Sequence, residues 1–99
     1  MTGTQSFTLD YLMACRCAYY CWQHSVTSDY AYDMLEADAM GWAPADHPLR
    51  RVGSSILDDR HYPPHVRALA LYLMDPQHER EPGLFNMYLS LKFRRRVVR

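Results

Sequence analysis

The chain has 99 residues, 48% of them hydrophobic, and a formal net charge of zero. A chain of this length forms one domain, because separate cores rarely form in so few residues, and its apolar content excludes intrinsic disorder. Without net charge, the molecule as a whole has no electrostatic attraction to nucleic acid. It contains neither a transmembrane run of about 18 apolar residues nor the basic and apolar regions of a signal peptide, so we expect a cytoplasmic protein.

Helical periodicity and capping signals predict an all-α fold, a small single domain of about four helices with irregular links rich in proline and glycine. The first helix is expected over residues 8–22, with Ser6 or Thr8 as its N-cap. Its core-facing stripe has helical spacing and consists of Leu12, Cys15, Tyr19 and Trp22. Ser28 caps a second helix over residues 29–40, and Gly41 follows as its C′ residue.

The rest of the chain is predicted to hold two further helices. Residues 41–53 form an irregular segment, and residues 54–61 one short turn. Pro63 and Pro64 open a third helix over residues 65–74, because proline is tolerated in a first helical turn. A fourth helix begins near Leu84, and its amphipathic stripe comprises Leu84, Met87, Tyr88 and Leu91.

Three cysteines, Cys15, Cys17 and Cys21, lie close together on the first predicted helix. Cys17 and Cys21 are four residues apart and could share a metal, but no second pair of ligands stands at zinc spacing. We therefore predict buried free thiols in a reducing cytosol, and no bound metal.

The most informative pattern lies at the start of the predicted second helix. Asp29, Tyr32 and Asp33 stand at i, i+3 and i+4, which places two carboxylates and a phenol on one helix face. Tyr19 and Tyr20, at the end of the first helix, can fold back over that face. Aromatic rings flanked by carboxylates suit a flat, positively charged ring, which they hold by stacking, cation–π attraction and charge-assisted hydrogen bonds. Oxidised nicotinamide is such a ring.

Three segments, in this order, resemble the N-terminal Ia subdomain of bacterial NAD-dependent DNA ligases, which binds the nicotinamide nucleotide. Tyr19 and Tyr20 correspond to the family's Tyr-His pair, residues 29–33 to its D-x-E-Y-D helix, and residues 48–53 to its S-P-x-x-R-V-G stretch. Tyr20 thus replaces the family's histidine, and Ala31 its glutamate. The resemblance covers about residues 9–53, and it implies a helical hairpin there, followed by C-terminal helices with a basic tail over residues 54–99.

The resemblance implies a site for NAD or nicotinamide mononucleotide formed by Tyr19, Tyr20, Asp29, Tyr32 and Asp33. The ring would lie between Tyr19 and Tyr32, with the two aspartates bonded to the carboxamide and the ribose hydroxyls. We expect Tyr32 to be a stacking platform, since a core would not accept unpaired carboxylates beside it. The alternative is that the aromatic rings belong to the core and the carboxylates serve the helix dipole.

The chain lacks the residues that ligation needs. A ligase carries AMP on the lysine of a K-x-D-G motif, whereas Lys92, the single lysine here, is followed by Phe93 and Arg94. We expect Lys92 to be exposed, without the pocket that lowers the pKa of a nucleophilic lysine. No HExxH, GxSxG or glycine-rich phosphate loop occurs either. The sequence therefore predicts a protein that is not an enzyme.

Arginines are the candidates for contacts with phosphate, nucleic acid or an acidic protein surface. Arg50 and Arg51 form one pair, and Arg94, Arg95 and Arg96 form a run in the last eight residues, which hold five of the eleven basic side chains. The alternatives are a solvated arginine pair and a solvated tail.

Two functions of different classes remain open. The first is a stand-alone ligase Ia-like module that binds NAD or nicotinamide mononucleotide without ligase chemistry, working in trans with another protein or sensing the nucleotide. The second is a small interaction or inhibitor protein, of a size common in phages and mobile elements, that docks on a larger host enzyme or nucleic-acid complex. A third, nucleic-acid binding through the basic C-terminus alone, is disfavoured by the zero net charge.

Overall fold

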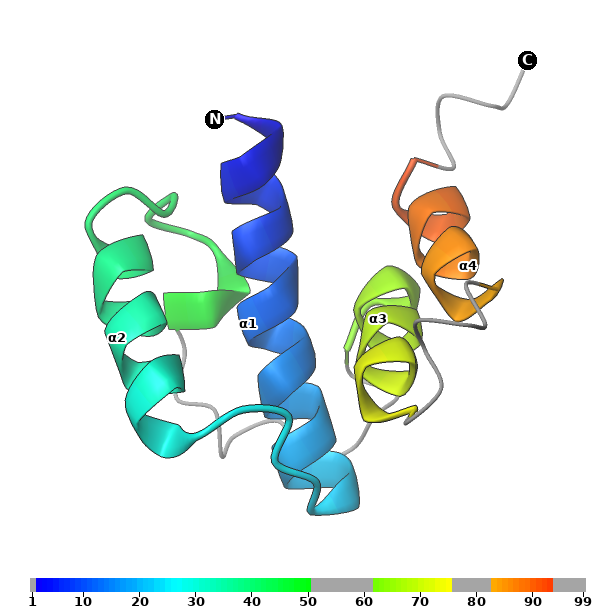
Figure 1. Cartoon of the computed structure of the whole chain (residues 1–99). Helices are drawn as coiled ribbons and strands as arrows, with labels where there is room; N and C mark the ends of the chain where they lie inside the picture. The colour runs from blue at the N-terminus through cyan, green and yellow to red at the C-terminus, as the bar shows by residue number, and fades with distance from the viewer. Residues whose placement is uncertain (1, 51–61, 76–82, 94–99) are drawn as a thin grey trace.

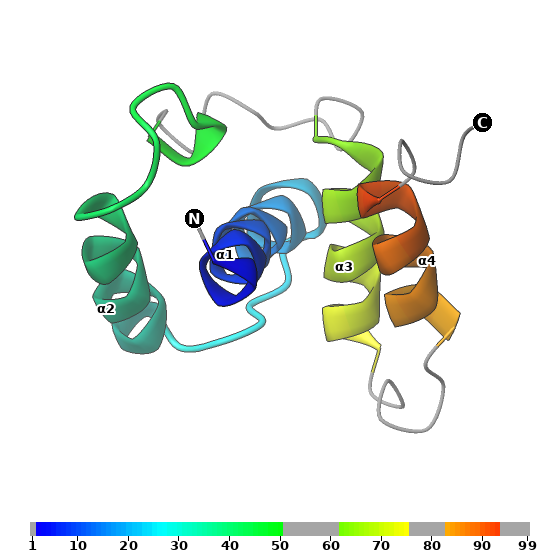
Figure 2. The same ribbon diagram turned by 90° about the horizontal axis from the view of Figure 1, so that it is seen from above.

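One long helix, α1 (Gly3–Trp22), runs through the middle of the molecule. The computed structural model describes residues 2–50, 62–75 and 83–93. Helix α2 (Asp29–Met40) lies on one side of α1, and α3 (Pro64–Met74) and α4 (Gly83–Lys92) form a pair on the other side (Figure 1; Figure 2). A short 3-10 helix, η1 (Pro48–Arg50), follows α2 and contacts α1. The predicted all-α fold of four helices is confirmed for these residues, which contain no strand.

Helix α1 begins five residues earlier than the sequence predicted. Thr2, rather than Ser6 or Thr8, is its N-cap, because Thr2 and Gln5 form a reciprocal capping box. The Thr2 hydroxyl accepts from the Gln5 amide at 3.1 Å, and the Gln5 side-chain oxygen accepts from the Thr2 amide at 3.1 Å. The Thr8 hydroxyl instead donates to the Thr4 carbonyl within the helix, at 2.9 Å.

The turn between α1 and α2 brings the two helices back against each other. Gln23 adopts a left-handed conformation (φ 51°), and the next amide, of His24, donates to the Ala18 carbonyl at 3.0 Å, which ends α1. Ser28 then caps α2 as predicted, its hydroxyl accepting from the Ala31 amide at 3.1 Å. At the other end of α2, Gly41 is the C-cap, but in a right-handed conformation (φ −74°).

Two further segments differ in detail from the prediction. The segment after α2, expected to be irregular, contains η1, in which Leu49 is fully buried and its amide donates to Nδ1 of His47 at 3.0 Å. Helices α3 and α4 each begin one residue before the predicted start, at Pro64 and Gly83. The predicted turn over residues 54–61 lies outside the described residues.

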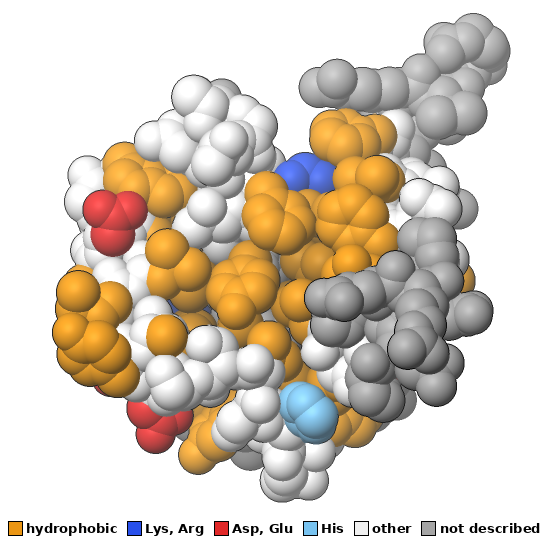
Figure 3. Space-filling model, viewed as in Figure 1, with side chains coloured by type: hydrophobic (Ala, Val, Ile, Leu, Met, Phe, Trp, Pro, Cys, Tyr) orange, Lys and Arg blue, Asp and Glu red, His pale blue; other side chains and the backbone are white. Residues whose placement is uncertain are grey.

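The hydrophobic core lies where α1 meets α2, η1, α3 and α4. It is built from small and medium side chains of α1 and α3, closed by Leu49, Tyr62 and Tyr88. On α1, Leu12 and Cys15 are buried as predicted, but Tyr19 of the same predicted stripe is exposed, because it lies at the end of the helix beside the α1–α2 turn. Met87 of the predicted α4 stripe is half exposed. Figure 3 shows hydrophobic side chains gathered between α1 and α4, and acidic side chains over α2. None of the described helices is long and apolar enough to cross a membrane.

A buried carboxylate joins α1 to α3 and α4. Asp10 is only 8% exposed, and it accepts from the Tyr88 hydroxyl and the Lys92 ammonium at 2.6 Å each, with Nε2 of His65 at 3.3 Å. Burial alone would raise the pKa of Asp10, but the hydrogen bonds from His65, Lys92 and Tyr88 outweigh it and lower the pKa. Asp10 is therefore ionised although it is buried, because its hydrogen-bond partners compensate for the loss of water.

The expectation that Lys92 would be exposed is wrong. Its ammonium lies between Asp10 and the Tyr88 hydroxyl, which accepts from it at 3.2 Å, and its side chain is 15% exposed. The physical reason is the long-range pairing of α4 with α1, which brings together residues far apart in the sequence.

We predict that Asp10→Asn lowers the free energy of unfolding by about 3 kcal/mol near pH 7, because Lys92 loses its partner in a largely buried site. The folded-state pKa of Asp10 lies below the ordinary value, so its contribution is present above about pH 4 and is lost as pH falls through the folded pKa. Urea unfolding of both proteins across this range measures it.

The matched control is Asp46→Asn, at an exposed aspartate in the loop after α2. It should leave the free energy of unfolding nearly unchanged at every pH. An Asp10→Asn protein whose deficit stays constant down to the most acidic pH would contradict the role assigned to the Asp10 charge.

Candidate functional site

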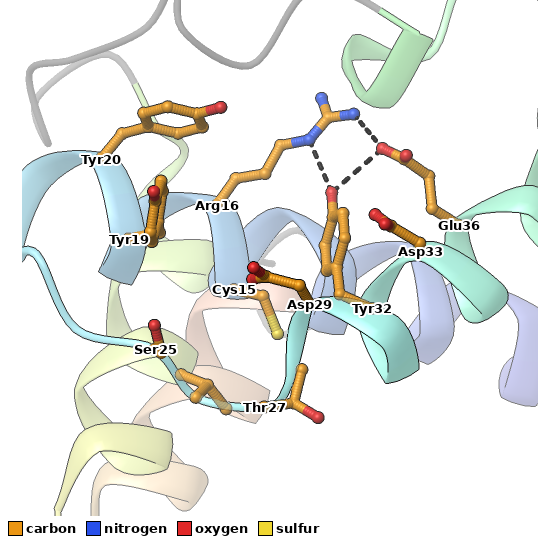
Figure 4. A pocket seen from close by; sticks show the side chains of 11 residues that line it. Cys15, Arg16, Tyr19, Tyr20, Ser25, Thr27, Asp29, Tyr32, Asp33 and Glu36 are labelled. Atoms are coloured by element: carbon orange, nitrogen blue, oxygen red, sulfur yellow. Dashed lines mark hydrogen bonds and ion pairs between the residues drawn. The ribbon is translucent and has the colours of Figure 1, made fainter.

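A pocket of about 310 Å³ lies between the C-terminal half of α1, the following loop and the first turns of α2 (Figure 4). We call it the α1–α2 pocket. It exists because the left-handed end of α1 turns the loop back and the Ser28 cap starts α2 beside it. Its lining combines tyrosines, carboxylates, one arginine and small polar residues: Cys15, Arg16, Tyr19, Tyr20, Ser25, Val26, Thr27, Asp29, Tyr32, Asp33 and Glu36.

All five residues predicted to bind the nicotinamide ring line this one pocket: Tyr19, Tyr20, Asp29, Tyr32 and Asp33. They come from two helices, and only the close packing of α2 on α1 brings them together. The pair on α1 forms one end of the pocket, and the three residues on α2 form the facing side (Figure 4).

The two adjacent tyrosines form a corner. The ring centroids of Tyr19 and Tyr20 are 5.0 Å apart and their planes cross at 83°, an edge-to-face arrangement. Tyr19 is 53% exposed, so its face is open to solvent and to a ligand. Because the two rings are perpendicular, only one of them can stack on a flat ligand while the other meets its edge.

Tyr32 combines the two roles that the sequence analysis treated as alternatives. Its ring is half-buried and packs against the hydrophobic core, and it also lines the pocket. Its hydroxyl accepts from Nε of Arg16 at 2.8 Å and donates to Oε2 of Glu36 at 3.1 Å. Burial is the largest cause that raises the pKa of Tyr32, so the phenol stays neutral at physiological pH.

Arg16 and Glu36 complete a triad with Tyr32 across the two helices. Nη2 of Arg16 donates to Oε2 of Glu36 at 2.5 Å, and both side chains are largely shielded from solvent. Burial alone would lower the pKa of Arg16, but the bond with Glu36 outweighs it and raises the pKa, so the guanidinium remains charged. Figure 4 shows the three polar groups meeting at one edge of the pocket.

Neither Arg16 nor Glu36 was among the predicted site residues. A signal was present, since Arg16 is the one basic residue of the first helix, and Glu36 continues the 29–33 face one turn further. The sequence could not pair them, because nothing local fixes how α2 lies against α1.

The carboxylates of Asp29 and Asp33 are the pocket's unpaired charges. Both are exposed, and neither forms a hydrogen bond or ion pair with any described residue. Glu36 is neutralised by Arg16, so the pocket's three carboxylates and one guanidinium leave a net charge of −2. Such a lining attracts cations and repels anions.

Two of the three cysteines are buried as predicted, namely Cys15 and Cys17, whereas Cys21 is half-buried. No disulfide joins the three. Cys15 borders the pocket, and burial raises its pKa to about 11, so it is a neutral thiol there. In the described part of the chain, no group of His, Cys, Asp and Glu side chains could hold a metal ion.

Arg50, a predicted contact for phosphate or a partner, lies away from the pocket. Its guanidinium donates to the carbonyls of Met40, Ala43 and Pro44 at 3.0, 2.6 and 3.0 Å, so it caps the end of α2 and holds the loop that follows. The other predicted arginines, Arg51 and Arg94–Arg96, lie outside the described residues.

Comparison with known proteins does not assign the chain to a family. No protein-family model, no curated protein and no solved structure matches the chain. The resemblance to the ligase Ia subdomain therefore stays a prediction, carried by the three sequence segments named above.

We predict that Tyr32→Phe lowers the free energy of unfolding by about 1 kcal/mol, because the hydroxyl that joins Arg16 and Glu36 is lost while the ring remains. Tyr30→Phe is the matched control, since Tyr30 is 74% exposed on the outer face of α2. Urea unfolding of the two variants measures the difference. Equal stabilities would show that the hydroxyl bridge adds nothing to the packing of α2 on α1.

Proposed function

We propose that the protein is a stand-alone binding module for nicotinamide mononucleotide or NAD, which holds the oxidised nicotinamide ring in the α1–α2 pocket and performs no ligation itself. The observation that carries the proposal is the convergence of five residues, chosen from sequence alone, on one pocket. Three of them offer aromatic faces or edges, and two offer unpaired carboxylates. A flat cation matches both features.

The residues take separate roles in this proposal. Tyr19 stacks on the nicotinamide ring, since its face is open, and Tyr32 closes the opposite side. Asp29 and Asp33 accept hydrogen bonds from the carboxamide and the ribose hydroxyls, and their charge attracts the pyridinium. The pocket volume is at the lower end of the range for ligand sites, roughly 300–1,000 Å³, which suits the nicotinamide end and leaves the rest of NAD outside.

The decisive measurement is a titration of the folded protein with nicotinamide mononucleotide, followed by tyrosine and tryptophan fluorescence and by calorimetry. We expect saturable binding and an increase in thermal stability on adding the ligand. Tyr19→Ala should abolish binding, while the matched Tyr30→Ala, which removes a more exposed ring outside the pocket, should leave it unchanged. No saturation with either nicotinamide mononucleotide or NAD would overturn the proposal.

Asp33→Ala should weaken binding by about 1.5–3 kcal/mol, one to two decades of affinity, through the lost bond to a charged acceptor. Helix content should not change, because the side chain is exposed and bonded to no described residue. Circular dichroism checks the fold and calorimetry the affinity. Unchanged affinity would assign Asp33 to the solvated helix face alone.

A second candidate, a small interaction or inhibitor protein, is supported by a shallow groove of about 220 Å³ at the junction of α1, α3 and α4. Leu71 and Met87 are exposed at its edge, and the buried Nε of Arg67 has no hydrogen-bond partner. An apolar groove with an arginine in its lining suits an amphipathic helix of a partner protein that carries a carboxylate facing Arg67. The lining residues are Trp22, Pro64, Arg67, Ala68, Leu71, Met87 and Leu91.

This second function is tested with a purified, identified partner in equimolar complex. Met87→Glu should abolish the complex by charging the groove, and Arg67→Gln should weaken it, while Tyr19→Ala should have no effect. A complex that survives Met87→Glu would exclude the groove as the docking site.

A further inference from the structure

The negative charge of the α1–α2 pocket favours the cationic part of a nicotinamide compound over its phosphate. We infer that the pocket recognises the nicotinamide riboside cation and rejects the phosphate, so that the uncharged-sugar nucleoside binds more tightly than the mononucleotide or NAD. The inference rests on the proposed function and refines it, because it names the preferred form of the ligand within the same site.

Among the described residues, the pocket offers no free cation to a phosphate. Arg16 is the only basic side chain of the described lining, and its guanidinium is held by Glu36 and by the Tyr32 hydroxyl. Turning it toward a phosphate would leave the Glu36 carboxylate, which is itself largely shielded, without its partner. The guanidinium of Arg16 is therefore held against Glu36 and Tyr32 of α2 and is not directed at a ligand.

The N-terminus of α2, a common place for phosphate binding, is partly occupied and carries a negative charge. The Ala31 amide donates to the Ser28 hydroxyl, and the Tyr32 amide donates to the Ser28 carbonyl. Asp29 occupies the first turn and sets its own negative charge against the positive end of the helix dipole. A dianionic phosphate would meet Asp29 before it met a free amide.

The arginine that the sequence analysis offered for phosphate is at the wrong end of α2. Arg50 binds the carbonyl of Met40, the last residue of this helix, roughly 16 Å along the axis from Asp29 at 1.5 Å per residue. Its Nε and Nη2 groups already donate to backbone oxygens. It therefore cannot offset the pocket's net charge of −2.

The neutral polar residues of the pocket suit the remaining part of a nucleoside. Ser25 and Thr27 stand on the loop that leads into α2 (Figure 4). The Thr27 hydroxyl is engaged by Tyr11, whereas the Ser25 hydroxyl can bond to a ribose hydroxyl. The tyrosines can stack on the nicotinamide ring, and Asp29 and Asp33 attract its positive charge, so each part of the riboside meets a group of matching chemistry. A phosphate meets no such group among the described residues of the pocket.

The test compares four compounds by calorimetry on the folded, full chain: nicotinamide riboside, its reduced dihydro form, nicotinamide mononucleotide and NAD. We expect the riboside to bind about tenfold more tightly than the mononucleotide, because the phosphate is repelled by the two unpaired carboxylates and salt screens this repulsion only in part. The reduced riboside, which has the same shape without the ring's charge, should bind at least about tenfold more weakly than the oxidised one.

The dependence of affinity on ionic strength is a second, independent test of the inference. Raising the ionic strength from about 0.01 M to about 0.15 M should weaken binding of the cationic riboside and leave binding of the anionic mononucleotide unchanged or stronger, because screening reduces attraction in one case and repulsion in the other. In Asp33→Asn, the preference for riboside over mononucleotide should shrink. In the matched Asp46→Asn control, outside the pocket, the preference should persist.

The outcomes separate the two proposals. Mononucleotide binding as tight as riboside binding, or tighter, would overturn the inference while leaving the proposed function intact. Equal affinity for the oxidised and reduced ribosides would also overturn it, since ring charge would then not be recognised. Failure of both nicotinamide mononucleotide and NAD to bind the folded protein would overturn the proposed function, and failure of all four compounds would overturn the inference with it.

Discussion

The link between Arg16 of α1 and the Glu36–Tyr32 pair of α2 is the interaction on which the pocket depends. It joins the two helices in a site largely shielded from solvent, where removing one partner is costly. It also decides the pocket's electrostatics. By neutralising Glu36 and occupying Arg16, it leaves Asp29 and Asp33 as the charges that face a ligand.

Helix α1 carries one buried charge toward each of its neighbours. Arg16 faces α2, while Asp10, six residues earlier and on a different side of the helix, faces α3 and α4. A central helix that buries most of its surface could slide or rotate against apolar partners at little cost. Two satisfied ion pairs on different sides, each with a tyrosine hydroxyl as a third member, fix its rotation and register.

These two sites divide the molecule by chemistry. The side of α1 that carries α2 presents exposed carboxylates and open tyrosine rings, which suit a small cation. The side that carries α3 and α4 presents an apolar groove with an arginine in its lining, which suits a partner helix. The two proposed functions therefore use different surfaces, and a single protein has room for both.

The sequence by itself predicted the four helices and five of the eleven residues that line the pocket. The Ser28 cap and the i, i+3, i+4 spacing on α2 are local features, so the phenol and two carboxylates shared a face wherever the helix packed. Where the prediction failed locally, at the start of α1, the signal was also local, since Thr2 and Gln5 form a capping box that the sequence contains.

Only the tertiary structure decided which charges remain free. Lys92 was expected to be exposed, yet it is paired with Asp10. Arg50, predicted as a contact for phosphate or a partner, also binds the last carbonyl of α2, a role that the sequence did not indicate. Arg16 and Glu36 find each other across 20 residues. Such pairings depend on how the helices pack against one another. The periodicity of a sequence indicates which face of a helix is apolar, but it does not indicate which charged side chain of a neighbouring helix will meet that face.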